Sequence, residues 1–490
     1  MPIYQSSRTG TSLSNNSYGG GFVFLSHRFK KRFRTVSLNL NTSYSDNNST
    51  SNSFSVNSFF QPVAKIDTLN LHTISSSRSM FFAPNLSYTE PVGKNEVIEI
   101  GYGVTYSKSN SAGNAYHLDN TTHQYDILDS LFSNSYDNSN ITQRTSLSFR
   151  IQNPKYNFSL GSAVQFTSLS SLNTTKNINI SENYTSYNPT MNLRYNFTRF
   201  DNLTINYNGQ SGFPSTGQLQ PLRTTSDSIN FQVGNPYLRP QFTHSFRLAY
   251  NSNSPVTQKG LSVNLNGALT ENNIVASVIE NSNGGKTSSY TNANGAFLVS
   301  GSVNYNFPLH RPKSNLGLTS GFGFNRSLSQ IDNVISTTDH GSITESIKWT
   351  TNLKRLFDFS IHTVTTYNMI RYSQQPAQNL NYFSQSVLTD ATVFTDNGWI
   401  FTVDFDYSWS GNQPAGYHVS VPLLNPGIAK QFLKGKAAEL RLTVFDLLNR
   451  NVSISHNVYE NVVQDTKTNV IGRYAMLTLT YNLRKPIPHK

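Results

Sequence analysis

Apolar and polar side chains alternate one by one along many stretches of this chain. Over residues 401–409, the apolar positions are Phe401, Val403, Phe405, Tyr407 and Trp409. Neighbouring side chains of a β-strand point to opposite faces, so this period predicts strands with one apolar and one polar face. Residues 35–60 form a stretch far longer than the roughly five or six residues of a usual globular strand. Since no segment keeps the period of a helix, we expect an all-β chain.

The composition narrows the kind of sheet. Hydrophobic residues make up 36% of the chain and charged residues only 13%, whereas a soluble domain carries about 25% charge. A transmembrane barrel fits this composition, because its outer face is apolar and aromatic while its interior is polar and watery. There is no run of roughly 18 apolar residues for a spanning helix. A closed barrel is then the remaining way to satisfy the backbone in lipid.

Turn sequences divide the chain into strands. Short turns are expected at FKKRF from Phe29, PVGKNE from Pro91, NPKY from Asn153, RFDN from Arg199, KRLFD from Lys354, TDNG from Thr395 and LKGK from Leu433. Long polar loops are expected at residues 110–140, 169–186, 209–241 and 331–341. Since a tilted strand crosses the bilayer in about 9–11 residues, we predict an antiparallel up-and-down β-barrel of about 19 strands. The first strand should begin near Tyr18, and the last should occupy residues 474–483. The short turns are placed in the periplasm and the loops outside the cell.

The net charge of +12 raises the question of nucleic-acid binding. The basic residues gather where turns are expected, and no basic helix or stripe interleaved with aromatics is present. Solvated turns are therefore the favoured interpretation, with outer-membrane lipid rather than nucleic acid as the partner. The absence of Cys excludes disulfides and thiolate metal sites. The first residues do not resemble a signal peptide, so we expect the N-terminus to be incomplete.

Charged residues on the polar faces of strands are candidates for the barrel interior. The alternation points six of them inward: Arg150, Arg194, Arg247, Arg441, Asp404 and Asp406. One interpretation is a charged pathway for anionic or polar solutes. The favoured alternative is that these charges pair with each other, with water or with a plug, since barrel interiors are routinely polar.

A search for catalytic and metal-binding residues favours a protein that is not an enzyme. His117 and His123 lie near Asp119 and Asp126, but the spacing matches no known ligand motif, so a polar loop is preferred to a metal site. There is no phosphate loop, dinucleotide fingerprint or zinc-protease motif. No cofactor is expected.

Four stretches resemble one family, the TonB-dependent-receptor-like outer-membrane barrels of Bacteroidota. They are LSYTEPVGKN from Leu86, VGNPYLRPQFTHSFRLAYN from Val233, ELRLTVFDLLNRNVSIS from Glu439 and NVIGRYAMLTLTYNLRK from Asn469. They occur in the family's order, and together the resemblance covers nearly the whole chain. In the second stretch, Gly234, Asn235, Pro236 and Pro240 are turn residues that fix where a strand begins.

The resemblance implies a barrel of about 22 strands with a plug domain inside. It also implies energy from the TonB complex through that plug, assembly by the barrel-assembly machinery, and a surface lipoprotein as a further partner. The closing strand of the family carries the assembly signal, which here would fall on Leu477, Leu479, Tyr481 and Leu483. No plug is recognised in residues 1–490, which we therefore expect to be a single barrel domain without its plug and first strands.

The function implied is uptake of a bulky nutrient across the bacterial outer membrane. Two alternatives remain, a passive channel without a plug and an extracellular adhesin or structural β-protein. A barrel enzyme has the least support, because no motif favours it.

Overall fold

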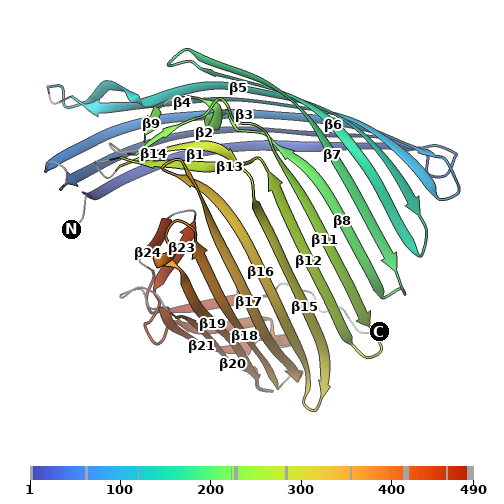
Figure 1. Ribbon diagram of the computed structural model, residues 1–490. Coiled ribbons are helices and arrows are strands. Elements are labelled where there is room, and N and C mark those ends of the chain that lie inside the picture. Colours follow the sequence, from blue (N-terminus) through green and yellow to red (C-terminus); the bar gives the residue numbers. More distant parts are fainter. Residues whose placement is uncertain are drawn as a thin grey trace.

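The chain forms one long curved sheet (Figure 1). The computed structural model describes residues 4–60, 64–119, 121–221, 223–225, 230–281, 285–353, 356–411, 419–459, 462–468 and 470–482. The strands of the wall are β1 (Tyr4–Arg28), β2 (Thr35–Phe59), β3 (Lys65–Pro91), β4 (Glu96–Leu118), β5 (Tyr125–Gln152), β6 (Tyr156–Asn173), β7 (Ile178–Asn196), β8 (Asp201–Gly212), β11 (Gln241–Ser254), β12 (Lys259–Glu271), β15 (Ala296–His310), β16 (Lys313–Ile331), β17 (Val334–Leu353), β18 (Phe357–Tyr372), β19 (Leu380–Phe394), β20 (Trp399–Ser410), β21 (Val419–Phe432), β22 (Ala438–Phe445) and β25 (Tyr474–Tyr481).

Each wall strand pairs antiparallel with the next one in this series. The sheet holds 23 strands in the described part of the chain, and four of them stand outside the series, which leaves 19 in the wall. Those four are β9 (Arg223–Thr225), β10 (Phe231–Val233), β13 (Asn273–Glu280) and β14 (Lys286–Ala293); a separate hairpin joins β23 (Ser453–Tyr459) to β24 (Val462–Thr468). The predicted all-β, up-and-down antiparallel architecture is confirmed.

Two adjacent rows of residues show why the sheet has two different faces. One row crosses ten strands in register and contains only polar residues and glycine: Arg150, Ser159, Asn192, Asn206, Arg247, Asn266, Ser300, Gly323, Ser342 and Asn368. The next row contains only apolar residues, a tyrosine and glycine: Phe149, Leu160, Met191, Tyr207, Phe246, Gly267, Val299, Phe324, Gly341 and Met369. The alternation of each strand is therefore kept in phase across the sheet.

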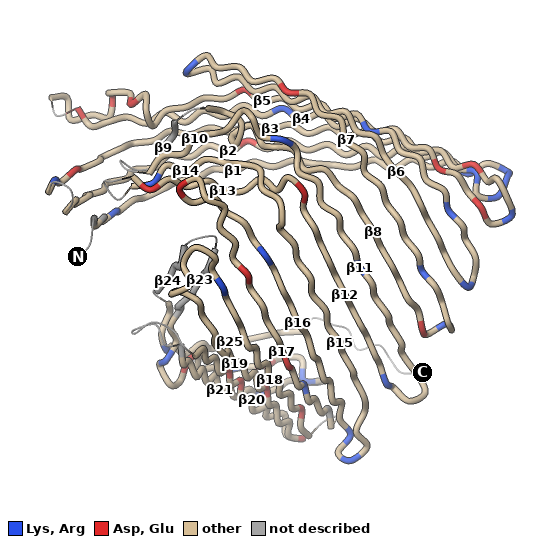
Figure 2. Tube along the Cα trace, in the orientation of Figure 1, with Lys and Arg blue, Asp and Glu red and all other residues tan. Residues whose placement is uncertain are grey.

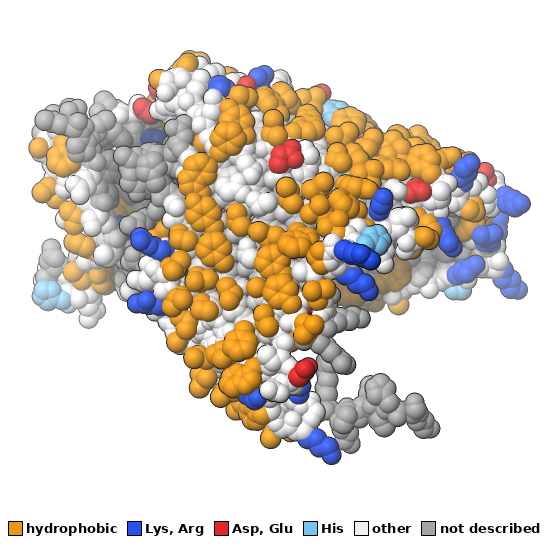
Figure 3. Space-filling view, turned by 90° about the horizontal axis from the view of Figure 1, so that it is seen from below, with side chains coloured by type: hydrophobic (Ala, Val, Ile, Leu, Met, Phe, Trp, Pro, Cys, Tyr) orange, Lys and Arg blue, Asp and Glu red, His pale blue; other side chains and the backbone are white. Residues whose placement is uncertain are grey.

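The apolar face is broad and exposed. Figure 3 shows a view in which apolar side chains cover much of the surface, with most Lys and Arg at its margins. Exposed large apolar residues lie on most strands of the wall, whereas soluble monomers rarely expose a large continuous apolar patch. The face therefore fits the lipid-facing band of a barrel. Among the described residues, no helix is both long enough and apolar enough to span a membrane.

Short turns join the strands at one end of the wall, here named the turn end. Six of the seven predicted turns are confirmed, at residues 29–34, 92–95, 153–155, 197–200, 395–398 and 433–437. The turn at Lys354 falls partly on residues outside the described ranges. Many basic residues lie at this end, as Figure 2 shows, in agreement with the interpretation of basic turns.

The opposite end, here named the loop end, differs from the prediction. Residues 110–140 and 169–186 are mostly the extended tips of the β4–β5 and β6–β7 hairpins. Residues 331–341 hold a turn of two residues, Asp332 and Asn333, both with positive φ. β1 likewise begins at Tyr4 rather than near Tyr18. Ser, Asn and Thr continue the ladder there, because the backbone hydrogen bonds of an antiparallel pair do not depend on the side chains. Only residues 209–241 contain the long loop that was predicted.

Candidate functional site: the polar inner face, its cavity and its cap

The polar row belongs to the inner face of the wall, and it holds the predicted interior charges Arg150 and Arg247. Arg150 stands opposite Ser159 of β6. Leu169 and Ser171 lie on the same face of β6 as Ser159, and a loop covers the sheet at these two residues. Arg247 stands between Asn206 and Asn266 on the neighbouring strands. Both arginines therefore point to the inner face, opposite to the face that carries the apolar row.

Most of the predicted interior arginines have partners on the same face. Arg150 forms an ion pair with Glu99 of β4. Arg441 donates to Glu439 from Nε at 3.0 Å and from Nη2 at 2.8 Å. Arg194 donates to the Asn196 side chain at 3.3 Å. Two of these partners are carboxylates and the third is a neutral amide.

The two predicted aspartates lie in an acidic part of the inner face. Asp404 stands directly opposite Asp390 of β19, and Asp406 follows two residues later on β20. Like charges directly opposite each other destabilise a sheet pair. Sequence analysis did not single out Asp390 or Asp358, although Asp358 alternates with Phe357 and Phe359 and so carries the same signal as Asp404.

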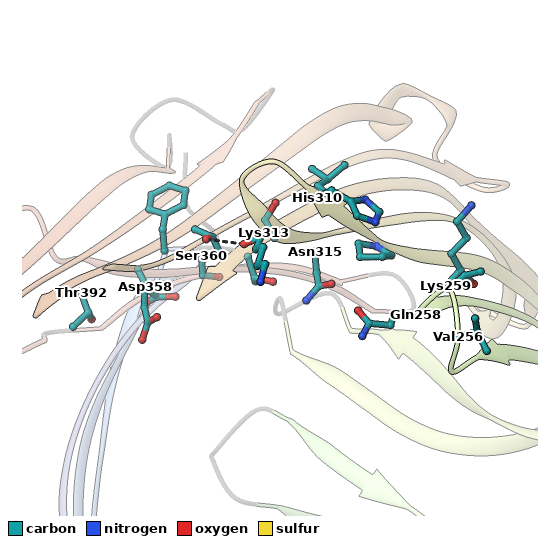
Figure 4. Close-up of a pocket in the computed structure, with 17 residues that line it drawn as sticks. Val256, Gln258, Lys259, His310, Lys313, Asn315, Asp358, Ser360 and Thr392 are labelled. Carbon is teal, nitrogen blue, oxygen red and sulfur yellow. Dashed lines mark hydrogen bonds between the residues drawn. The ribbon is translucent and has the colours of Figure 1, made fainter. Parts of the chain in front are cut away.

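A cavity of about 1080 Å³ lies on the inner face near the turn end. It is lined by the turn between β11 and β12 and by the turn-end parts of β15 to β19. Figure 4 shows Asp358 and Thr392 on one side, Lys313 and Asn315 in the middle, and His310 on the other side. The lining thus carries acids on β18–β19 and bases near the β15–β16 turn. The arrangement suits a hydrated polar solute, since it offers both donors and acceptors.

A folded loop covers the inner face at the loop end. The described residues of this segment, 213–221, 223–225 and 230–240, are named the cap. The cap includes the short helix α1 (Thr216–Leu219), which Ser215 caps through its hydroxyl group. Leu219 and Leu238 of the cap pack against Leu169 of β6 and Ile180 of β7. Gln220 donates to the Ser171 hydroxyl group at 2.7 Å. The cap is therefore anchored to the wall by a small apolar core and buried polar contacts.

The Gly-Asn-Pro sequence of the cap has a specific structural role. A Cβ atom at Gly234 would lie 2.2 Å from the Gln220 carbonyl oxygen, so only glycine permits this approach. The Asn235 side chain donates to the Tyr290 carbonyl oxygen of β14 at 2.9 Å. Asn292, also in β14, donates to the Arg239 carbonyl oxygen at 2.9 Å. The turn prediction is confirmed, since β11 begins at Gln241, and the turn also ties the cap to the β13–β14 hairpin.

The β13–β14 hairpin extends the cap toward β16. β14 pairs parallel with β10 of the cap, and β13 pairs parallel with the end of β16. Val275 and Ala293 pack with Leu328 of β16 in a second small core. Sequence analysis missed this hairpin, because its short strands carry only weak alternation.

The predicted closing-strand residues lie on the outer face of β25. Leu477 and Leu479 stand opposite Leu442 and Leu440 of β22, while Thr478 stands opposite Arg441 on the inner face. Leu477, Leu479 and Tyr481 are exposed. Leu483 lies outside the described residues. The assembly signal assigned to these four residues stays a prediction.

His117 lies in β4 and contacts an acid of β5. His117 Nε2 lies 2.6 Å from the Asp129 carboxylate, while Asp119 accepts from the Thr121 backbone N–H at 2.6 Å. Within the described ranges, no three His, Asp or Glu side chains are placed to hold a metal ion.

Glu90, near the end of β3, binds basic residues of the β1–β2 turn. Its carboxylate accepts from Arg34 at 2.6 Å and 2.7 Å, from Lys31 at 2.8 Å and from the Tyr88 hydroxyl group at 2.6 Å. The hydrogen bonds from Arg34, Lys31 and Tyr88, in that order of importance, hold the pKa of Glu90 well below its ordinary value of 4.5. Glu90 thus links the β1–β2 turn to the end of β3.

Replacing Glu90 by Gln should lower the free energy of unfolding at neutral pH but not in acid. Because the folded-state pKa is depressed, the contribution of the carboxylate is complete above about pH 4.5 and declines as the pH falls toward the folded-state pKa. Urea unfolding of the wild type and Glu90→Gln across this range measures the difference. Arg34→Gln should cause a similar loss, and the double variant should add little. A difference that does not change with pH would contradict the assignment.

An exposed apolar band, a polar inner face and an up-and-down antiparallel wall define a transmembrane barrel of the outer-membrane type. The model of the outer membrane protein beta-barrel family matches residues 27–481, and the chain belongs to this family. The family and the apolar band place the protein in the outer membrane.

Solved outer-membrane structures show a distant likeness. The ferric citrate transporter FecA in its unliganded form is 12% identical, with 91% of this chain and 62% of FecA covered at a TM-score of 0.44. FpvA of P. aeruginosa bound to a pyoverdine is 11% identical, with 94% and 55% covered at 0.47. The hemophore receptor HasR of Serratia marcescens, with HasA and heme, is 11% identical, with 98% and 71% covered at 0.46. This chain thus spans less than two thirds of the length of FecA and of FpvA. No curated protein matches the sequence.

Proposed function

We propose that this chain is the wall of an outer-membrane receptor or transporter for a bulky nutrient. The observation that carries the proposal is the continuous polar inner face, which runs from the cap at the loop end to the cavity at the turn end. A solute taken up from outside would meet the cap first and then the inner charges.

We further propose that the intact parent contains more strands and a plug. The described strands leave one edge of β1 and one edge of β25 without a partner strand, and such edges invite pairing with other strands. The family resemblance supports a plug inside the wall, and it makes the TonB complex, the barrel-assembly machinery and a surface lipoprotein the expected partners. The DNA upstream tests this: a plug-encoding region in or near frame supports it, and a promoter and signal sequence directly before Met1 would refute it.

The alternatives can be separated by two measurements. A passive channel predicts a steady open pore in planar bilayers, whereas a plugged receptor predicts silence from the intact parent. An adhesin or other extracellular β-protein predicts recovery without detergent. The exposed apolar row favours the membrane protein, because soluble monomers rarely expose so large an apolar area.

Uptake by cells tests the transport proposal directly. Cells carrying the intact parent should accumulate one solute from a panel of iron complexes, haem, cobalamin and oligosaccharides, and an uncoupler should abolish accumulation. Replacing residues 213–240 by a short Gly-Ser linker should abolish uptake while the protein still reaches the outer membrane. Uptake that survives both treatments would contradict the proposal.

A further inference from the structure

A carboxylate stands on the apolar face of the wall. Along β17, the outward positions include Ile343, Glu345 and Ile347, and both isoleucines are exposed. Glu345 is exposed as well. An ionisable side chain within a lipid-facing band is costly, and it is a functional candidate by default. The alternation of β17 predicts an apolar side chain at position 345, so the carboxylate is an exception to the pattern.

Glu345 belongs to a polar row on the outer face. Ser320, Glu345, Thr365 and Gln385 stand side by side on β16, β17, β18 and β19. Ser320 donates to Glu345 at 2.7 Å, and Thr365 donates to the side-chain amide oxygen Oε1 of Gln385 at 2.5 Å. Gln385 donates in turn to Thr363 at 2.5 Å; a second contact, with the Ser386 carbonyl oxygen, is long at 3.5 Å. We name Ser320, Glu345, Thr365 and Gln385 the outer polar row.

The outer polar row lies within the apolar band, not at its margin. Toward the loop end, the next outward row is Phe322, Ile343, Tyr367 and Phe383, and the one beyond begins with Phe324, Gly341 and Met369. Toward the turn end, the next row is Leu318, Ile347, Thr363 and Val387, and the one beyond begins with Leu316, Trp349 and Ile361. The two rows on each side of the outer polar row extend roughly 13 Å along a strand in each direction. Because the apolar band of a barrel is about 25 Å tall, the outer polar row lies near the middle of such a band.

We propose that the outer polar row is a dimer interface between two copies of this chain in the membrane. Two copies with the same orientation are related by a two-fold axis along the membrane normal. When this axis passes beside β18, the row of one copy faces the row of the other in reverse order. Because the strands are tilted by about 35–45°, the two rows cross at the axis, where the two Thr365 side chains meet. Glu345 of each copy lies on the same side of the axis as Gln385 of the other copy.

The chemistry of the row fits this pairing. A carboxylate has about four acceptor sites, and among the described residues Ser320 is its one hydrogen-bond donor. The amide of Gln385 has two N–H groups. One donates to Thr363 at 2.5 Å, and the other has only the long contact of 3.5 Å with the Ser386 carbonyl oxygen among described residues, so it can be given to a partner's carboxylate. β17 and β19 lie about 10 Å apart on either side of β18. The row is thus self-complementary under the two-fold axis, with an acceptor on one side and a donor on the other. The flanking Ile343, Tyr367 and Phe383 supply the apolar surround that excludes lipid and water.

The absence of cysteine from the chain makes the test direct. Thr365→Cys should form a disulfide-linked dimer in native outer membranes under mild oxidation, because the two side chains meet at the axis. Leu265→Cys, on the outer face of β12, is the matched control and should stay monomeric. Glu345→Leu in the Thr365→Cys background should reduce dimer formation roughly tenfold, since two symmetric hydrogen bonds are lost and each is worth a few-fold in a membrane.

The stability of the wall separates an interface role from a merely structural one. If Glu345 served only to brace β16 against β17, Glu345→Leu would lower the free energy of unfolding. The single chain should unfold at an equal or higher urea concentration, because a lipid-exposed charge has been removed from the apolar band. Equal crosslinking at Thr365→Cys and Leu265→Cys, or no dimer from Thr365→Cys in assembled protein, would overturn the proposal.

Discussion

Replacing Leu265 by Arg is expected to lower the free energy of unfolding in a lipid bilayer by about 2–4 kcal/mol. Leu265 lies on the apolar face of β12, between Leu248 of β11 and Gly301 of β15, and it is 43% exposed. A guanidinium group at this position would be placed in the hydrocarbon region. Urea unfolding of protein reconstituted in phosphatidylcholine vesicles measures the loss.

The neighbouring residue of the same strand supplies the control. Asn264 points to the inner face, opposite Ala249 and Ser302, neither of which is charged. Asn264→Arg should change the free energy of unfolding by less than about 0.5 kcal/mol, as is usual for a solvated position. Equal losses from both substitutions would mean that the two faces meet the same environment, and the membrane assignment of the outer face would be wrong.

Replacing Gly234 by Ala is expected to detach the cap without unfolding the wall. The added Cβ atom would lie 2.2 Å from the Gln220 carbonyl oxygen and 2.7 Å from its nitrogen. Relief of this clash must break the hydrogen bond from Gly234 to Gln220, which is 2.9 Å long. Overpacking of this kind costs about 1–3 kcal/mol, so proteolytic cleavage within residues 213–240 should accelerate roughly tenfold or more.

Gly217 provides the matched control for the cap. It lies in α1, and a Cβ atom there would meet nothing within 4 Å. Gly217→Ala should leave the cleavage rate unchanged or lower it, since Ala favours a helix over Gly. If both variants were cleaved at the same rate, the close approach at Gly234 would not be what holds the cap in place.

The wall could be predicted from the sequence, because each strand carries its own alternation. Residues such as Leu261, Val263 and Leu265 show one face without any knowledge of neighbouring strands. The short turns were found for the same reason, as Gly, Asn, Pro and charged residues punctuate the strands locally. The inward placement of Arg150 and Arg247 followed from strand parity alone.

The ends of the wall could not be predicted in this way. In the β4–β5 and β6–β7 tips, Ser, Asn and Thr occupy both faces, so a strand held by backbone pairing has the composition of a loop. The packing of Leu219 against Leu169 depends on segments far apart in the sequence. The cavity, likewise, brings His310 and Asp390 together only through the order of the strands.

One signal in the sequence was readable and was missed. In the stretch from Ile343 to Ile347, Glu345 takes an outward position of a strand whose other outward residues are apolar. Strand parity identifies such a residue as easily as it identifies an inward arginine. A charge on the wrong face is more informative than one on the expected face, because the polar interior accepts charges at little cost.

Single-cysteine labelling along β12 tests the central claim most directly, since the chain contains no cysteine. Cysteine is placed in turn at each position of residues 261–266 in protein reconstituted in vesicles, and labelling by a water-soluble maleimide is measured. Cysteines at positions 262, 264 and 266 are expected to react from the aqueous inner face. Positions 261, 263 and 265 should be protected, and a fluorophore attached there before reconstitution should be quenched by lipids with a spin label on the acyl chain. Uniform labelling of all six positions would contradict a wall with one face in lipid and one in water.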